Sequence, residues 1–468
     1  MKQTKIVATI GPASETPEIL EALARAGANV FRLNFSHGDH SWFKTIIERI
    51  RAMNEKNGFN VAILLDTKGP EIRTGELEET VYVKAGDELI LSIDPGDYAE
   101  TGKVGVNYDA FIGDVEVGER ILVDSGVINL TVKAKTAKDV ICEVHDEGEI
   151  TSRRHLNIPM KEVSLDSITE KDWADIDFGI EMKVDFIALS FVRNAEDVTE
   201  LRAYLKKHNS NIAIIPKVES YQATQHLPSI VKEADGIMVA RGDLGAEVPF
   251  SHVPRIQHEL IELASQFRKP VIVATHMLES MIENPMPTRA EVSDVNNAVW
   301  QGTDAVMLSG ESAAGEYPVK SVETMAEIAK QTEIDFVQDK GLRQIEITSP
   351  REEFALLAAR VTEDLDEVKA IFVMTRTGKG ARLISAFRPK VPIFAFTDSK
   401  EVQNQLQLVW GVTPYHIEFS DTPEETVQRA KQRFLKNDLE WKGTSIVLAS
   451  DTLNEARESI PTIQLRTL

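Results

Sequence analysis

The sequence predicts an α/β protein whose main domain is a (β/α)8 TIM barrel, with an inserted β-rich domain and a C-terminal α/β domain. Eight short apolar runs alternate with amphipathic helical stretches, which is typical of parallel βα units. Their spacing is interrupted once, after the third run, and a further βα series follows the eighth. An open doubly wound sheet would fit the same number of runs.

The eight runs give the expected barrel strands in chain order. They are residues 5–10, 30–36, 61–67, 185–190, 212–219, 236–243, 270–275 and 305–310.

The interruption contains short alternating strands with turn signals between them, at 81–83, 89–93 and 121–123. After a helix around 319–335, a polar stretch leads to a second series of expected strands at 370–375, 392–397, 414–419, 445–449 and 462–465. We therefore expect barrel domain A at 1–72 and 161–340, the inserted β-rich domain B at 73–160, and the C-terminal domain at 341–468.

Charge and cysteine content exclude several classes of function. A net charge of -22 over 468 residues, without a basic run, argues against nucleic-acid or anionic-membrane binding. The one cysteine, Cys142, cannot form an internal disulfide. No apolar stretch approaches the length of a membrane span. These features predict a cytoplasmic protein.

Polar side chains gather at the ends of the expected strands. Residues two apart in a strand share a face, so each of these sets should point one way: Arg32, Asn34 and Ser36; Lys217 and Glu219; Arg241 and Asp243. Asp66 and Thr275 end two further runs. Any one of them alone is more often a helix cap or a surface ion pair. Five strand ends that converge on one barrel mouth favour an active site.

The residue types indicate the chemistry of this site. Glu219 and Asp243 could hold a hard divalent ion, with Arg32 and Lys217 flanking a phosphoryl group. Backbone amides at Gly242 could approach an anion. The residues alone therefore predict metal-assisted chemistry on a phosphorylated acid. His37 and His276 lack a third partner for zinc, and Thr288–Glu291 reads first as a capping box that opens a helix.

Six motifs, in this order and spacing, resemble pyruvate kinase over nearly the whole chain. They are Thr4–Ser14 (TKIVATIGPAS), Arg32–Gly38 (RLNFSHG), Leu65–Arg73 (LDTKGPEIR), Pro216–Glu219 (PKVE), Met238–Gly245 (MVARGDLG) and Pro287–Glu291 (PTRAE).

The resemblance implies transfer of phosphate from phosphoenolpyruvate to ADP, giving ATP and pyruvate. It implies that Glu219 and Asp243 bind Mg2+ or Mn2+. It also implies substrate and catalytic roles for Arg32, Lys217, Gly242, Asp243 and Thr275, with Lys217 stabilising the transition state. Arg73 would face the nucleotide phosphates, and Arg154 stands where many relatives contact nucleotide with a lysine. The inserted domain would close over the nucleotide, and the chain would form a homotetramer.

A potassium ion is also implied, with Asn34, Ser36, Asp66 and Thr67 as its ligands. Glu71 stands where family members that require potassium carry glutamate. The alternative is that Glu71 only pairs with a nearby arginine.

Regulation and two other functions stay open at this point. Residues 375–380 could bind an effector phosphate at a helix N-terminus, or form an ordinary βα turn. Segment 449–455 lacks the glycine-rich loop that completes the effector pocket in many relatives. The alternative functions are a carbon–carbon lyase that binds phosphoenolpyruvate or pyruvate in a similar barrel, and a catalytically silent regulatory paralogue.

Overall fold

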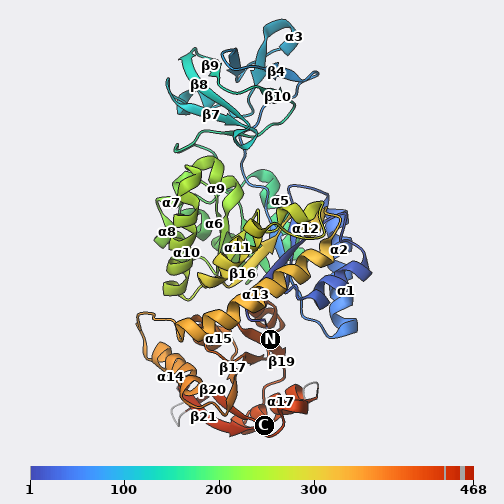
Figure 1. Cartoon of the computed structure of the whole chain (residues 1–468), viewed down its shortest axis with the longest axis vertical. Helices are drawn as coiled ribbons and strands as arrows, with labels where there is room; N and C mark the ends of the chain where they lie inside the picture. Colours follow the sequence, from blue (N-terminus) through green and yellow to red (C-terminus); the bar gives the residue numbers. More distant parts are fainter. Residues whose placement is uncertain (1, 437–438, 454–458) are drawn as a thin grey trace.

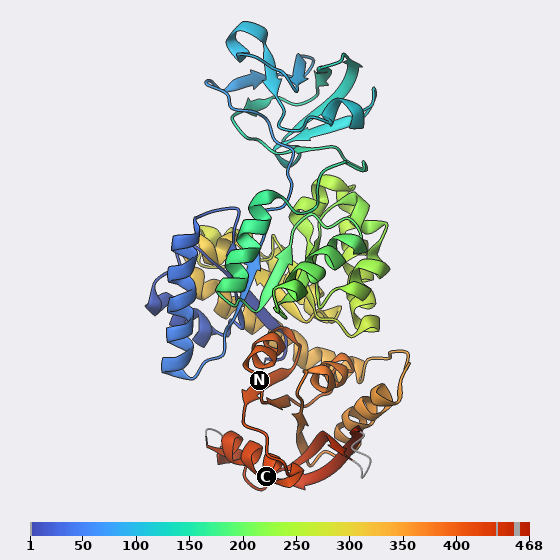
Figure 2. The same ribbon diagram turned by 180° about the vertical axis from the view of Figure 1, so that it is seen from behind.

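The computed structural model describes residues 2–436, 439–453 and 459–468. The molecule is elongated and has three parts in a row (Figure 1). The inserted β-domain lies at one end, the barrel in the middle and the C-terminal domain at the other end. Figure 2 shows the N-terminus between the barrel and the C-terminal domain, where Gln3 O accepts a hydrogen bond from Gly411 N.

The barrel is closed and its eight strands are parallel, in the order β1-β16-β15-β14-β13-β12-β3-β2. The strands are β1 Lys5–Ile10, β2 Val30–Asn34, β3 Ala62–Asp66, β12 Phe186–Leu189, β13 Ala213–Val218, β14 Ile237–Ala240, β15 Val271–Ala274 and β16 Ala305–Leu308. Each predicted run contains one of them, so the predicted barrel is confirmed and the open-sheet alternative is wrong.

Helices cover the outside of the barrel, and alternate residues of the strands divide between two cores. Along β1, Val7 points into the barrel interior, whereas Ile6 and Ile10 pack against the helices. The helical segments are α1 Pro17–Ala26, α2 His40–Asn57, α5 Glu170–Glu181, α6 Ala195–Lys207, α7 Tyr221–Thr224, α8 Leu227–Glu233, α9 Arg241–Glu247, η2 Phe250–His252, α10 Val253–Phe267, η3 Glu279–Ile282, α11 Arg289–Trp300, α12 Gly310–Ala313 and α13 Pro318–Lys340.

The inserted domain follows β3 and has its own apolar core around Leu91, Phe111, Leu130 and Cys142. Its main sheet has the order β11-β7-β8-β9-β5-β6, and β10 pairs with β4 in a second sheet. The elements are β4 Val81–Val83, β5 Glu88–Ser92, α3 Tyr98–Thr101, β6 Lys103–Gly105, α4 Phe111–Asp114, β7 Arg120–Val123, η1 Asp124–Gly126, β8 Ile128–Lys135, β9 Asp139–Val144, β10 Gly148–Ile150 and β11 Leu156–Asn157.

The C-terminal domain is a five-stranded sheet in the order β19-β18-β17-β20-β21, with one apolar core on each face. Its last strand, β21, is antiparallel to β20. The elements are α14 Pro350–Asp364, β17 Val368–Met374, α15 Lys379–Ala386, β18 Ile393–Thr397, α16 Lys400–Gln405, η4 Leu406–Leu408, β19 Val412–His416, α17 Pro423–Leu435, η5 Leu439–Trp441, β20 Ser445–Leu453 and β21 Ser459–Thr467. Of segment 449–455, residues 454 and 455 lie outside the described residues.

The C-terminal domain packs against the barrel floor, which we define as the amino-terminal ends of the strands. Leu408 is fully buried and joins the cluster of side chains that fills the barrel interior. Asn404 donates to Asp185 Oδ1 over 2.7 Å, and Lys5 donates to Val412 O over 2.6 Å. Apolar and polar contacts therefore both cross this interface.

One expectation about a strand end is wrong. Arg241 and Asp243 do not share a strand face, because β14 ends at Ala240 and helix α9 begins at Arg241. The two residues lie in the first helical turn, where residues two apart point in different directions. By contrast, Thr288 and Glu291 form the predicted capping box at the start of α11.

Among the described residues, no helix is long and apolar enough to cross a membrane.

Candidate active site

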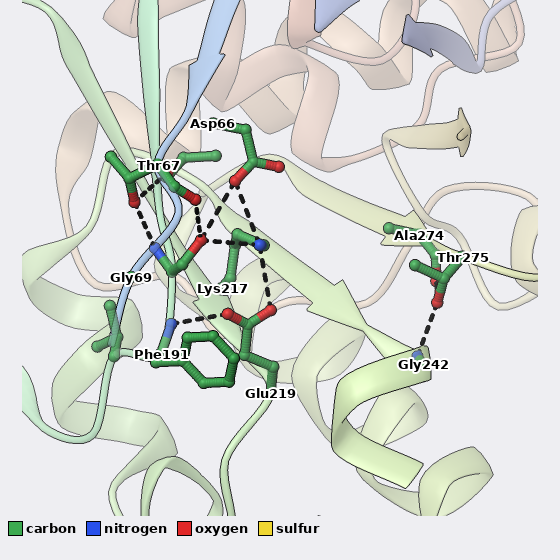
Figure 3. A network of polar contacts seen from close by, with 12 residues as sticks. Asp66, Thr67, Gly69, Phe191, Lys217, Glu219, Gly242, Ala274 and Thr275 are labelled. Carbon is green, nitrogen blue, oxygen red and sulfur yellow. Dashed lines mark hydrogen bonds and ion pairs between the residues drawn. The ribbon is translucent and has the colours of Figure 1, made fainter. Parts of the chain in front are cut away.

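Four of the predicted site residues, Arg32, Asp66, Lys217 and Glu219, form one polar network at the barrel mouth, the carboxyl ends of the strands. Figure 3 shows the last three of them. Arg32 Nε donates to Asp66 Oδ2 over 2.5 Å. The ammonium of Lys217 lies 3.2 Å from Asp66 Oδ1 and 3.2 Å from Glu219 Oε2. Since β2, β3 and β13 end at the same rim, residues far apart in the sequence meet here.

The charges of this network fix the protonation of Lys217 and Asp66. Burial alone would raise the pKa of Asp66, but the Arg32 and Lys217 cations outweigh it and hold the pKa below its usual value. Burial acts to lower the pKa of Lys217, and the Asp66 and Glu219 carboxylates reverse this effect and raise the pKa. Lys217 is therefore a permanent cation that cannot act as a base near neutral pH.

Glu219 is fully buried, and its two oxygens differ. Oε1 accepts a hydrogen bond of 2.7 Å from the Phe191 amide. Oε2 faces Lys217 but has no hydrogen-bond partner among the described residues. Burial raises the pKa of Glu219 to about 8, against the opposing effect of Lys217. A buried carboxylate oxygen without a donor suits a hard cation, so this oxygen fits Mg2+ or Mn2+.

Backbone geometry next to the network depends on Gly69. Its φ is +73°, and a Cβ atom there would lie 2.8 Å from both the Phe191 ring and Ser190 Cβ. Only glycine fits without displacing the segment that presents the Phe191 amide and the Ser190 hydroxyl. The Gly69 amide in turn donates to Asp172 at the start of α5.

Thr275 and Gly242 form a second polar pair at the ends of β15 and β14. The Thr275 hydroxyl accepts from the Gly242 amide over 2.8 Å and donates to Ala274 O over 2.7 Å. Thr275 has φ +69°, a strained conformation for a β-branched residue. Arg241 holds it there by donating to the Thr275 carbonyl over 2.5 Å and pairing with Asp294 over 2.7 Å.

Asp243 lies near enough for its charge to raise the pKa of Glu219. Among the described residues, no group of three or more histidine, cysteine or acidic side chains could enclose a metal ion. A site with two carboxylates leaves positions for substrate oxygens, as expected of a catalytic rather than a structural magnesium site.

The predicted potassium ligands lie beside the network. Asn34 is the register partner of Asp66 across β2 and β3, and its side-chain oxygen accepts from the Ser36 amide. Thr67 follows Asp66, and its hydroxyl accepts from the Ser190 amide. Glu71 accepts from Arg73 Nε over 2.7 Å, so the arginine pairing given as the alternative is present. That pairing lowers the pKa of Glu71 in opposition to burial.

Arg73 and Arg154 lie apart from the network, at the junction with the inserted domain. Arg73 Nη1 donates to the Arg153 carbonyl. Arg154 pairs with Asp124 over 3.1 Å and donates to the Thr151 hydroxyl. Both guanidinium groups thus use part of their donor capacity inside the chain, and both keep about a third or more of their side-chain surface exposed.

Sequence reasoning missed Ser190 and Thr9. Ser190 accepts from Lys217 Nζ over 2.9 Å and donates to the Thr67 carbonyl over 2.5 Å. Thr9 accepts from Arg32 Nη1 over 3.0 Å. Each stands at or near the carboxyl end of a predicted strand, and that position was the available signal.

The chain is similar to known proteins in both sequence and structure. Residues 1–322 match the family model "Pyruvate kinase, barrel domain", and residues 352–464 match "Pyruvate kinase, alpha/beta domain". The chain is 46% identical to plastidial pyruvate kinase 2 of Arabidopsis thaliana, over 96% of this chain and 77% of that protein. It is 44% identical to a pyruvate kinase of Bacillus licheniformis, over 97% and 79%. A crystal structure of a pyruvate kinase from Cryptosporidium parvum superposes with a TM-score of 0.91 at 34% identity, covering 100% of this chain and 96% of that one.

Proposed function

The chain belongs to the pyruvate kinase family, and from this premise we propose that it transfers the phosphoryl group of phosphoenolpyruvate to ADP, giving ATP and pyruvate. The observation that carries the proposal is the contact of Lys217 with both Asp66 and Glu219 at the barrel mouth. The names of the relatives favour this reaction over a carbon–carbon lyase and over a silent paralogue.

Arg32 and Lys217 would bind the phosphoryl group of the substrate. Each is a buried cation held by Asp66, so its position is set before substrate arrives. As the transferring group loses its bond to the enolate oxygen, the fixed ammonium of Lys217 would stabilise the charge on its oxygens.

The substrate carboxylate would bind between the ends of β14 and β15. The amides of Gly242 and Asp243 and the Thr275 hydroxyl are the donors available there. Because the Gly242 amide already donates to Thr275, a bound carboxylate would replace this hydrogen bond and use both groups. The left-handed backbone at Thr275, fixed by Arg241, supports this assignment.

Glu219 and Asp243 would hold Mg2+ or Mn2+, which supplies charge neutralisation between the substrate phosphate and carboxylate. Oε2 of Glu219 accepts no hydrogen bond and faces the Lys217 ammonium, which supports this role. We further propose potassium at Asn34, Ser36, Asp66 and Thr67.

On the nucleotide side, we propose that Arg73 and Arg154 contact the phosphates of ADP. The inserted domain, with boundaries at residues 73 and 160, would act as a lid that excludes water. The half-exposed arginines at its junction with the barrel support this role. The second barrel segment would then run to residue 340 and the C-terminal domain from 341 to 468.

Three properties of the whole protein complete the proposal: a cytoplasmic location, a homotetramer, and a phosphorylated effector at residues 375–380. The last is supported by the turn from β17 into α15, where the Thr375 hydroxyl accepts from the Gly378 amide.

A coupled assay that follows ATP formation from phosphoenolpyruvate and ADP tests the function directly. Activity should require both Mg2+ and K+. Consumption of phosphoenolpyruvate without ATP would favour the lyase, and no consumption under any metal condition would favour the silent paralogue.

A further inference from the structure

A second cavity lies at the opposite end of the barrel from the active site. It lies between the barrel floor and the C-terminal domain, and one side of it opens to solvent. We propose that this cavity binds a phosphate group, either as inorganic phosphate or as the head of a small phosphate monoester.

The lining of the cavity is strongly cationic in a chain whose net charge is -22. Its charged side chains are Arg268, Lys269, Arg343, Arg382, Arg388 and Asp304. The barrel contributes Arg268 and Lys269, which follow α10, and Asp304, which precedes β16. The other three residues come from the C-terminal side of the chain. Five cations thus face one carboxylate.

The two carboxylates nearest these cations, Asp304 and Glu352, are each already paired with an arginine. Asp304 pairs with Arg388 over 3.1 Å, and it also accepts from the Val271 and Trp410 amides. Arg268 pairs with Glu352 over 3.1 Å, outside the cavity lining. Two ion pairs therefore account for two of the five cations.

The other three cations have only neutral acceptors. Lys269 donates to the Ala234 carbonyl, Arg343 to the carbonyls of residues 301 and 302, and Arg382 to the Thr377 carbonyl. Within the described part of the chain, no carboxylate lies within 4.0 Å of their charged nitrogens. All three side chains are half-buried, and an anion in the cavity would give them the close counter-ion that they lack.

Hydrogen-bond donors around the cavity are also unsatisfied. The Nε atoms of Arg268, Arg382 and Arg388 are buried and have no partner among the described residues. The Arg388 side chain is only 3% exposed and the Arg268 side chain only 9%. Burial lowers the pKa of Arg343 to about 10, with a further lowering by Arg388. The unpaired Nε donors and the excess of positive charge therefore both favour an anion with several acceptor oxygens in this cavity.

The size of the cavity selects a small ligand. The space of about 270 Å³ between its lining residues includes the mouth that is open to solvent, so the enclosed part is smaller and suits only a small anion. A tetrahedral oxyanion presents several acceptors to converging guanidinium groups, which is the preferred geometry for phosphate. Since the cations come from two domains, a bound phosphate would also tie the C-terminal domain to the barrel.

The test uses the full chain and two probes, inorganic phosphate and glycerol 3-phosphate, with NaCl at matched ionic strength. Calorimetry should show saturable binding below about 1 mM, and the probe should raise Tm. The two probes separate the sources, because a monoester site prefers glycerol 3-phosphate and a phosphate site does not. Arg343→Gln should weaken binding at least tenfold, and Lys269→Gln provides a second measurement should the first variant not fold.

The matched control is Arg429→Gln in α17, whose arginine pairs with Glu425 outside the cavity. This variant should bind both probes as the unmodified chain does. Three results would overturn the proposal: no saturable binding up to 10-fold above 1 mM, unchanged affinity in both cavity variants, or loss of binding in Arg429→Gln instead. The active site lies at the other end of the barrel, so phosphate bound there would not respond to the cavity variants.

Discussion

Lys217 Nζ and Asp66 Oδ1 lie 3.2 Å apart although their strands, β13 and β3, are separated by β12. The residue that follows β12, Ser190, fills the gap and contacts both of them. The Lys217 ammonium is therefore held by three adjacent strands, and its position depends on a hydroxyl group as well as on two carboxylates.

Ser190→Ala should lower kcat by about 10- to 100-fold, since a hydrogen bond to a charged group contributes about 1.5–3 kcal/mol. The loss should be smaller than in Lys217→Met, because Asp66 and Glu219 still hold the ammonium. Ser321→Ala is the control: it removes a similar hydroxyl-to-carbonyl bond in α13, away from the site. Steady-state kinetics compare the three variants. Equal kcat in Ser190→Ala and the unmodified chain would contradict the role of Ser190.

Glu219→Gln should lower kcat at least about 100-fold and leave the fold intact. The amide keeps an oxygen for the Phe191 amide, but it removes the charge that would hold the divalent ion. Glu279→Gln changes an exposed carboxylate near the same rim and should have little effect. The kcat of both variants is measured over a magnesium titration. Thermal unfolding checks that each variant is folded. Near-normal activity of Glu219→Gln at ordinary magnesium would show that the metal assignment is wrong.

The sequence predicted the fold and the central network well because both follow from strand ends. Lys217 and Glu219 were assigned from the periodicity of a strand, and the barrel closure brings them to Asp66 and Arg32. Arg241 was misread, since periodicity does not show where β14 gives way to α9. Ser190 is missed because a serine at a strand end is equally typical of a helix cap, and the Phe191 amide is missed because a backbone group carries no sequence pattern.

Activity of the unmodified chain should be weak without monovalent metal ions and rise strongly with K+. In Glu71→Lys, the new ammonium should replace part of the cation's charge, so the variant should need less potassium. The variant also breaks the pairing with Arg73, so its maximal rate should fall severalfold. Glu76→Lys breaks a more exposed arginine pair, with Arg153, and serves as the control.

A potassium titration of the coupled assay distinguishes the two interpretations of Glu71. Full activity of the unmodified protein in a buffer free of potassium and sodium would contradict the potassium site. A Glu71→Lys variant that loses rate and keeps the same potassium requirement would assign Glu71 to the arginine pairing alone.

Asp185 should make the protein less stable as the pH rises from about 4 to about 6. Burial raises its pKa to about 6, although the Ile63 amide and Asn404 donate to its oxygens. The unfolded carboxyl titrates near 3.9. The folded chain therefore binds the extra proton between these values, and stability falls as that proton is lost.

Asp185→Asn removes this titration and should increase the free energy of unfolding above pH 6 by at most about 3 kcal/mol, or two pKa units. The gain should vanish near pH 4. Asp177→Asn, at an exposed aspartate that accepts from Tyr204, should give no such gain. Urea unfolding at pH 4.5 and 8 measures the difference. A variant that is less stable than the unmodified chain at pH 8 would contradict the assignment.

Leu408 belongs to the C-terminal domain but completes the hydrophobic interior of the barrel. The catalytic domain therefore has no closed lower surface of its own, and a chain cut between the two domains would expose that interior to water. We expect the barrel and the C-terminal domain to unfold in a single cooperative step, so that proteolysis yields no stable catalytic fragment. Because the two domains share this packing, a conformational change in the C-terminal domain can be transmitted directly to the strands that carry the site.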